Sequence, residues 1–252
     1  MRNCIVYGVI VLVSAAGSLL HAKETLLPVK FSDVKIEDNF WTRRLEVNRT
    51  VSIPHNLDTC ESTGRIRNFA QAAGVDKTPF RGHYFHDSDV FKVLEGAAYS
   101  LANHPDEKLE ARLDHIIDLI ARSQKPDGYL NTWFTLKEPD KRWTDIRVKH
   151  ELYCAGHMFE AAVAHYHATG KRTFLDVACR YADYIDSVFG PGRRHVVPGH
   201  EEIELALVKL WRATGNERYL KLSRFFVYEH GRKETHDLFG EYCQDHLPIS
   251  GQ

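Results

Sequence analysis

The stretch HELYCAGHMFEA, residues 150–161, contains three side chains of metal-binding types at helical spacing. His150, Cys154 and His157 stand at i, i+4 and i+7, so on a helix they share roughly one face. Imidazole and thiolate are good ligands for zinc and similar metals. The zinc-protease pattern HExxH is not matched, because Cys154 replaces the second histidine. A metal site, a substrate site and a core helix are three open interpretations.

Polar clusters stand at the N-termini of three predicted helices, the one that follows His150 and two others. If the three helices run parallel, all the clusters converge at one mouth. Acids are favoured in the first helical turn by capping and by the helix dipole, and Glu201 and Glu202 are interpreted as such residues. For Asp87 and Asp89, helix capping and a functional role are both open interpretations. The clusters are His86, Asp87 and Asp89; His150 and Glu151; and His200, Glu201 and Glu202.

Histidines have no such preference, because the positive end of the helix dipole disfavours a charged imidazole. His150 and His200 each follow a long loop directly, so we interpret them as functional. A neutral imidazole can donate or accept at each nitrogen, which suits sugar hydroxyls. His157 lies two turns further on among apolar residues, where a satisfied core histidine is the favoured interpretation. Cys154 is interpreted as a small buried hydrophobe.

Aromatic residues gather in the longest loop, at the same end as the histidines. Aromatic faces with polar rims are typical of sugar-binding clefts. The alternative is that two or three of these rings pin the loop to the domain. Tyr129 and Trp133 are the expected substrate contacts. The four rings are Tyr129, Trp133, Phe134 and Trp143.

A repeat of helical hairpins positions these residues. ATGKRTFLDVACR from Ala168 is echoed by ATGNERYLKLSRF from Ala213, which suggests stacked helix pairs. The first helix of each pair is apolar nearly all round, which indicates an inner helix, and the second is amphipathic, which indicates an outer one. The predicted pairs are 89–103 with 106–124, 150–168 with 171–189, and 200–213 with 216–230.

The connections alternate between short inner-to-outer turns and long outer-to-inner loops, so the long loops all emerge where the inner helices begin. Function usually sits on such loops. The sequence therefore predicts an all-α fold, an α/α toroid of the (α/α)6-barrel type, here an incomplete half with about three hairpins. Residues 23–86 are predicted as an irregular and helical lead-in, and residues 87–252 as the partial barrel.

Composition limits the function classes. The chain has 252 residues, 43% of them hydrophobic, and a net charge of −1. Acids and bases are interspersed, so neither nucleic acid nor a membrane surface is an expected partner. Residues 1–22 read as a signal peptide, with Arg2, an apolar run and Ala22 at the cleavage point, and a short membrane anchor is the alternative. We therefore expect a periplasmic or secreted protein without a membrane segment after cleavage, and its cysteines are expected to be mostly free thiols.

The motifs HDSDVFKVLEGAAYSLANHPD, QKPDGYLNTWF, HELYCAGHMFEA and GHEEIELALVKLW resemble those of glycoside hydrolase family 127, the β-L-arabinofuranosidases. The resemblance covers roughly residues 30–250. It implies an (α/α)6 barrel followed by β-sandwich domains. It also implies that His150 and His200 bind the sugar. Asp87 and Asp89 lie in the same motif region, without a definite role.

The resemblance further implies retaining hydrolysis by a zinc-bound cysteine thiolate, with a glutamate as general acid/base. The family's catalytic and zinc-binding residues are expected downstream of this chain. We therefore expect no catalytic residue and no metal ligand here, and zinc only in the intact enzyme. The expected function is a β-L-arabinofuranosidase acting on arabinose-containing plant glycans, present as a truncated, inactive chain whose partner is the missing C-terminal half. A non-catalytic carbohydrate-binding or interaction module derived from such an enzyme is the alternative.

Overall fold

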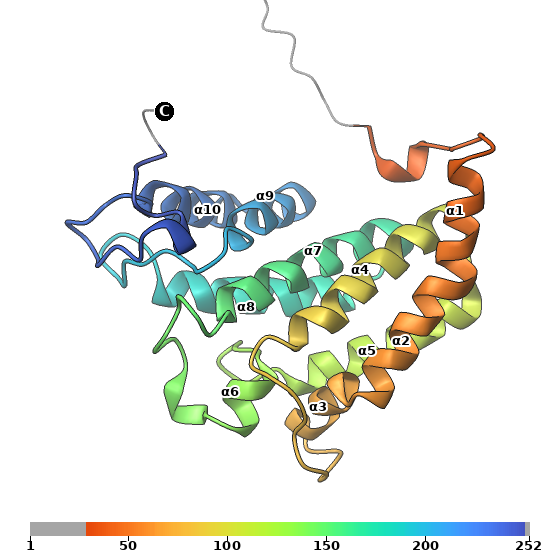
Figure 1. Ribbon diagram of the computed structural model, residues 1–252, viewed down its shortest axis with the longest axis horizontal. Helices are drawn as coiled ribbons and strands as arrows, with labels where there is room; N and C mark the ends of the chain where they lie inside the picture. Colours follow the sequence, from red (N-terminus) through yellow and green to blue (C-terminus); the bar gives the residue numbers. More distant parts are fainter. Residues whose placement is uncertain (1–28, 250–252) are drawn as a thin grey trace, which may run out of the picture.

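The computed structural model describes residues 29–249, which form no strand and fold into packed helices (Figure 1). The predicted all-α, α/α toroid-like architecture is confirmed. The expected signal peptide, residues 1–22, lies outside the described residues. Within the part of the chain that the structure describes, no helix is both long and apolar enough to cross a membrane.

Three helical hairpins form the body of the fold, and they are the three pairs predicted from the repeat. The inner helix α7 lies between the inner helices α4 and α9, and the three begin at the same end of the layer (Figure 1). The outer helices cover the other side. The pairs are α4 (Asp87–Asn103) with α5 (Glu107–Ser123), α7 (Glu151–Thr169) with α8 (Thr173–Val188), and α9 (Ile203–Thr214) with α10 (Glu217–Glu229).

Glycines end two of the inner helices where the sequence predicts them. Gly170 and Gly215 have φ of 73° and 72°, a left-handed conformation that glycine adopts without steric cost. Their N–H groups donate to the carbonyls of Tyr166 and Trp211. The chain can therefore reverse within a few residues, which keeps this end of the hairpins compact.

The lead-in is more regular than expected. Helices α1 (Trp41–Val47) and α2 (Ile53–Ser62) are joined by a π-helical turn, and α3 (Arg65–Ala72) follows. Helix α2 packs along α4 and α3 along α5. Leu57 and Phe69 are buried, at 1% and 0% exposure, and the ring of Phe69 lies 5.6 Å from that of Phe91 in α4. The lead-in is thus a further part of the helical wall.

The longest loop, residues 124–150, is pinned to the domain and contains the short helix α6 (Thr132–Leu136) and a 3-10 turn (Pro139–Lys141). Tyr129, Phe134 and Trp143 are buried in it. The interpretation that several loop aromatics hold the loop in place is therefore confirmed for these three rings.

Every cysteine among the described residues is a free thiol, as expected. Cys154 is 2% exposed, and its thiol points to the carbonyl oxygen of Phe85 at 3.6 Å. Burial raises the pKa of Cys154 well above its ordinary value. A thiol held protonated is a poor metal ligand and nucleophile, so Cys154 acts as a packed small side chain.

Candidate functional site

The predicted mouth exists, and two histidines meet in it. The rings of His150 and His200 lie 4.7 Å apart in an edge-to-face arrangement. Tyr153 lies 5.2 Å from His200. Phe85, just before α4, lies 6.0 Å from His150. The beginnings of α4, α7 and α9 therefore converge, as the alternation of loop lengths predicts.

His150 occupies a strained position directly before α7. Its φ of 57° and ψ of 27° are left-handed, and its side chain makes no capping hydrogen bond. Such a conformation costs a non-glycine residue roughly 1–2 kcal/mol. Burial, and then the neighbouring His200, lower the pKa of His150, so the imidazole is neutral near pH 7. Strain of this kind is often found at functional positions.

Gly199 sets the distance between the two histidines. A Cβ atom at this position would lie 1.8 Å from the carbonyl oxygen of Arg147. Only glycine allows the loop before His200 to touch the loop before His150 so closely. The pair of imidazoles thus depends on a contact between two long loops.

Asp87 binds a residue of the long loop. It is 3% exposed, and its carboxylate accepts hydrogen bonds from the N–H and the hydroxyl of Thr132 at 2.7 and 2.5 Å. Burial raises the pKa of Asp87 to about 6, against the effect of these two bonds. Its carboxylate therefore ties the loop to the start of α4.

Glu151 forms a second tie, and Tyr129 is its partner. The Tyr129 hydroxyl and the main-chain N–H of Trp143 donate to the two carboxylate oxygens of Glu151 at 2.5 and 2.7 Å. Tyr129 and Glu151 are both 0% exposed. Burial raises the pKa of Glu151 to about 7. Tyr129 thus holds the loop against α7 through its hydroxyl.

The two remaining expected contacts keep some exposed surface. Asp89 pairs with Arg65, with 2.6 Å between Oδ2 and Nε. Trp133 is half-buried, packs against Phe80 at 5.5 Å, and donates its indole N–H to Glu138 at 3.1 Å. Of the six predicted substrate contacts, the structure brings His150 and His200 together, buries Asp87 and Tyr129, and leaves Asp89 and Trp133 partly exposed.

A polar stripe on α7 was missed at the sequence level. His150, Tyr153, His157 and Glu160 stand at i, i+3, i+7 and i+10, so they share one face of the helix. The Tyr153 hydroxyl accepts a hydrogen bond from Lys92 of α4 at 2.5 Å. The spacing was visible in the sequence, but the surrounding apolar residues made α7 look apolar nearly all round.

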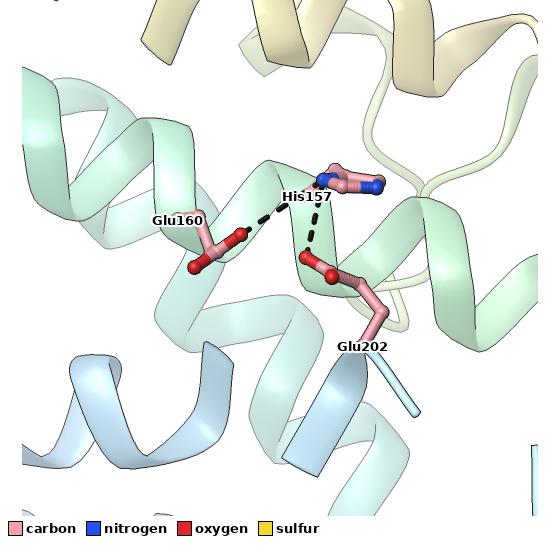
Figure 2. Close-up of side chains that lie close together, drawn as sticks. All are labelled: His157, Glu160 and Glu202. Carbon is pink, nitrogen blue, oxygen red and sulfur yellow. Dashed lines mark ion pairs between the residues drawn. The ribbon is translucent and has the colours of Figure 1, made fainter. Parts of the chain in front are cut away.

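The deeper end of this stripe meets Glu202 (Figure 2). His157 Nδ1 lies 3.1 Å from Glu202 Oε1 and 3.9 Å from Glu160 Oε2. Glu202 stands at the N-cap of α9, yet its side chain makes no capping hydrogen bond. The structure therefore corrects the interpretation of Glu202 as a cap. It gives the largely buried His157 a carboxylate partner on the neighbouring helix, which the sequence did not identify.

The protonation states in this cluster follow from burial. Burial, and then the adjacent Glu160 carboxylate, raise the pKa of Glu202 above its ordinary value. Burial, and then the nearby Lys92 ammonium, lower the pKa of His157. Both side chains are therefore uncharged near neutral pH when only protons occupy the cluster.

Comparison with known proteins agrees with this geometry. A family model described as the catalytic domain of GH127 β-L-arabinofuranosidase matches residues 33–252. The chain belongs to glycoside hydrolase family 127.

Its relatives in GH127 are longer proteins. A non-reducing end β-L-arabinofuranosidase of Bifidobacterium longum subsp. longum is 47% identical, over 79% of this chain and 34% of that protein. A crystal structure of a GH127 β-L-arabinofuranosidase from Geobacillus stearothermophilus T6 superposes with a TM-score of 0.81 and 45% identity, over 87% of this chain and 39% of that one. A further solved GH127 β-arabinofuranosidase superposes with a TM-score of 0.79 and 44% identity, over 88% of this chain and 36% of that one. This GH127 chain thus spans about a third of the curated relative's length.

Proposed function

We propose that this chain forms the sugar-facing mouth of a β-L-arabinofuranosidase that acts on arabinose-containing plant glycans. The meeting of His150 and His200 at 4.7 Å supports this proposal most directly. Family membership and the names of the relatives supply the substrate class.

The chemistry of the mouth suits a furanose. His150 and His200 both keep some exposed surface, so a sugar hydroxyl can reach the mouth that they form. A neutral imidazole offers one donor and one acceptor, which matches the dual character of a hydroxyl group. Trp133 adds a partly exposed aromatic face, and Asp89 a carboxylate, on the same side as the long loop.

We place the hydrolytic step outside this chain. The family resemblance assigns the zinc-bound cysteine nucleophile and the glutamate acid/base to a later region, which makes the chain one part of a longer or divided enzyme. The greater length of the relatives supports this assignment. The C-terminal half of the barrel is then the expected protein partner, and zinc belongs to the assembled enzyme.

We also propose that the protein is exported from the cytoplasm. Cleavage after Ala22 would release a protein into the periplasm or the medium, where plant glycans are encountered. Mass spectrometry of the mature protein tests this proposal, because an intact N-terminus on protein recovered from the cytoplasm would contradict it.

Binding and turnover are best measured separately. Saturation-transfer NMR should show L-arabinose binding by the full chain, lost in His150→Ala and in His200→Ala. His167→Ala, an exposed change at the far end of α7, should retain binding. Binding that survives both mouth substitutions would contradict the proposed site.

The second measurement concerns catalysis. The chain alone should release no product from a chromogenic β-L-arabinofuranoside, and turnover that disappears in His150→Ala would show that catalysis lies within it. The DNA downstream of the Gln252 codon adds a simple check. A continuation with a glutamate–cysteine motif and paired cysteines favours a hydrolase, whereas unrelated sequence favours the carbohydrate-binding module.

A further inference from the structure

Three potential metal ligands converge below the mouth, between α7 and the start of α9. One ligand atom each from His157, Glu160 and Glu202 lies within 4.8 Å of the others (Figure 2). Their side chains are 13%, 9% and 13% exposed. An imidazole with two carboxylates is a ligand set that suits zinc and similar divalent ions.

Two of the ligand atoms face each other across a short distance. His157 Nδ1 and Glu202 Oε1 are 3.1 Å apart, both are buried, and neither has a hydrogen-bond partner other than this one. Buried polar atoms are almost always paired, so a proton or a cation must lie between these two. A metal ion in place of that proton would satisfy both atoms and would also use Glu160.

Gly156, inside α7, leaves room for the side chain of Glu202. A Cβ atom on Gly156 would lie 2.6 Å from Glu202 Cγ and 3.0 Å from its carbonyl carbon. A glycine inside a helix is less stable than alanine by roughly 0.5–1 kcal/mol. Gly156 therefore lowers the stability of α7 at the place where Glu202 approaches His157.

Side chains of both charges surround the cluster. Three carboxylates, those of Glu95, Glu160 and Glu202, face this region from α4, α7 and the start of α9. Lys209 serves two of them, because its ammonium pairs with Glu160 and lies 3.9 Å from Glu95. Lys92, the other nearby base, donates to Tyr153. When Glu202 gives up its proton to an incoming metal ion, three carboxylates face two ammonium groups here.

We propose that His157, Glu160 and Glu202 bind a divalent transition-metal ion. Ligand atoms about 2.0–2.1 Å from a tetrahedral ion lie ~3.4 Å apart. The observed separations of 3.1 and 3.9 Å bracket that value, so small side-chain rotations suffice. Glu160 keeps its second oxygen for Lys209, and Glu95 supplies a further partner for that ammonium.

The site is also reachable from solvent. A hollow of about 410 Å³, lined partly by Glu160, Lys209 and Tyr99, opens beside the cluster. A metal site needs such an entry path as well as its ligands. The proposal uses only residues of this chain and does not depend on whether the mouth binds arabinose.

Metal titration of the full chain tests the proposal. After dialysis against a chelator, calorimetry with Zn²⁺ should show one ion bound per chain. His157→Gln and Glu202→Gln should each weaken binding about tenfold or more, since each removes a ligand. Gly156→Ala should also weaken it, because it displaces Glu202 while leaving every ligand in place. Glu201→Gln is the matched control and should bind as the wild type does.

A Co²⁺ titration assigns the ligands by absorption. The expected spectrum is that of a nitrogen and oxygen site, without the intense near-ultraviolet band of a thiolate. Circular dichroism establishes that each variant is folded. Failure of the wild type to take up Zn²⁺, binding that persists unchanged in His157→Gln, or a thiolate band with Co²⁺ would each overturn the proposal.

Discussion

Replacing Glu151 with alanine should release the long loop from α7. The change leaves the Tyr129 hydroxyl and the Trp143 N–H buried without an acceptor. Each buried unpaired donor costs about 1–3 kcal/mol, so the free energy of unfolding should fall by about 2–6 kcal/mol. Trp143 also has a left-handed φ of 60°, and the hydrogen bond to Glu151 helps to hold it there.

Glutamine at the same position separates hydrogen bonding from charge. Its carbonyl can accept from the Trp143 N–H, and its amide can donate to the Tyr129 hydroxyl, which rotates to accept. At pH 4.5 the Glu151→Gln protein should therefore unfold within ~1 kcal/mol of the wild type.

The wild type should lose stability relative to this variant as the pH rises. The folded-state pKa of Glu151, about 7, lies above its ordinary value of 4.5 in an unfolded chain, so the folded state holds the proton more tightly. The stabilising contribution is complete below pH 4.5 and is lost as the pH rises through 7. At about 1.4 kcal/mol per pH unit, the difference from glutamine should change by ~3 kcal/mol in favour of glutamine.

Urea unfolding followed by circular dichroism, at several pH values between 4.5 and 8, measures all three proteins. Hydrogen exchange in residues 124–150 reports on the loop itself. An alanine variant within ~0.5 kcal/mol of the wild type would refute the assigned role of Glu151, because that is the range of ordinary surface changes. A wild-type-to-glutamine difference that does not vary with pH would refute the burial argument.

Three further predictions concern the mouth and its supports. His150→Gly should be more stable to urea than His150→Ala by ~1 kcal/mol, because only glycine adopts φ of 57° freely, and equal stability would show that the position is unstrained. Gly199→Ala should lower the free energy of unfolding by ~1–3 kcal/mol through its clash with Arg147. It should also weaken arabinose binding in the NMR assay, and unchanged binding would mean that His200 does not depend on this contact. Asp87→Ala should speed hydrogen exchange at Thr132 and lower the free energy of unfolding by ~2–6 kcal/mol, because two donors lose their acceptor, and unaltered exchange would contradict the tie.

The hairpins and the mouth could be predicted because their signals are local. The glycines at 170 and 215 end their helices through their own backbone preference, and the repeat around them identifies the pairs. Loop lengths then place His150 and His200 at one end without any knowledge of packing. Each of these inferences uses residues that lie close together in the chain.

The ties and the cluster of His157, Glu160 and Glu202 could not be predicted, because their partners are distant or their local preference points elsewhere. Asp87 and Thr132 are 45 residues apart, and no periodicity links them. Glu202 has a residue type favoured at helix starts, so its type alone indicates capping. Only the packing of α9 on Gly156 shows that its carboxylate turns towards another helix.

The ties between the long loop and the inner helices also bear on the order of folding. Asp87 and Thr132 are 45 residues apart, and Tyr129 and Glu151 are 22 residues apart, so we expect these ties to form after the contacts within the hairpins. Interactions absent from the folding transition state leave the folding rate unchanged and slow the unfolding rate. The two buried carboxylates should therefore set how long the native chain survives once formed, while the hairpin contacts of neighbouring helices set how fast it forms.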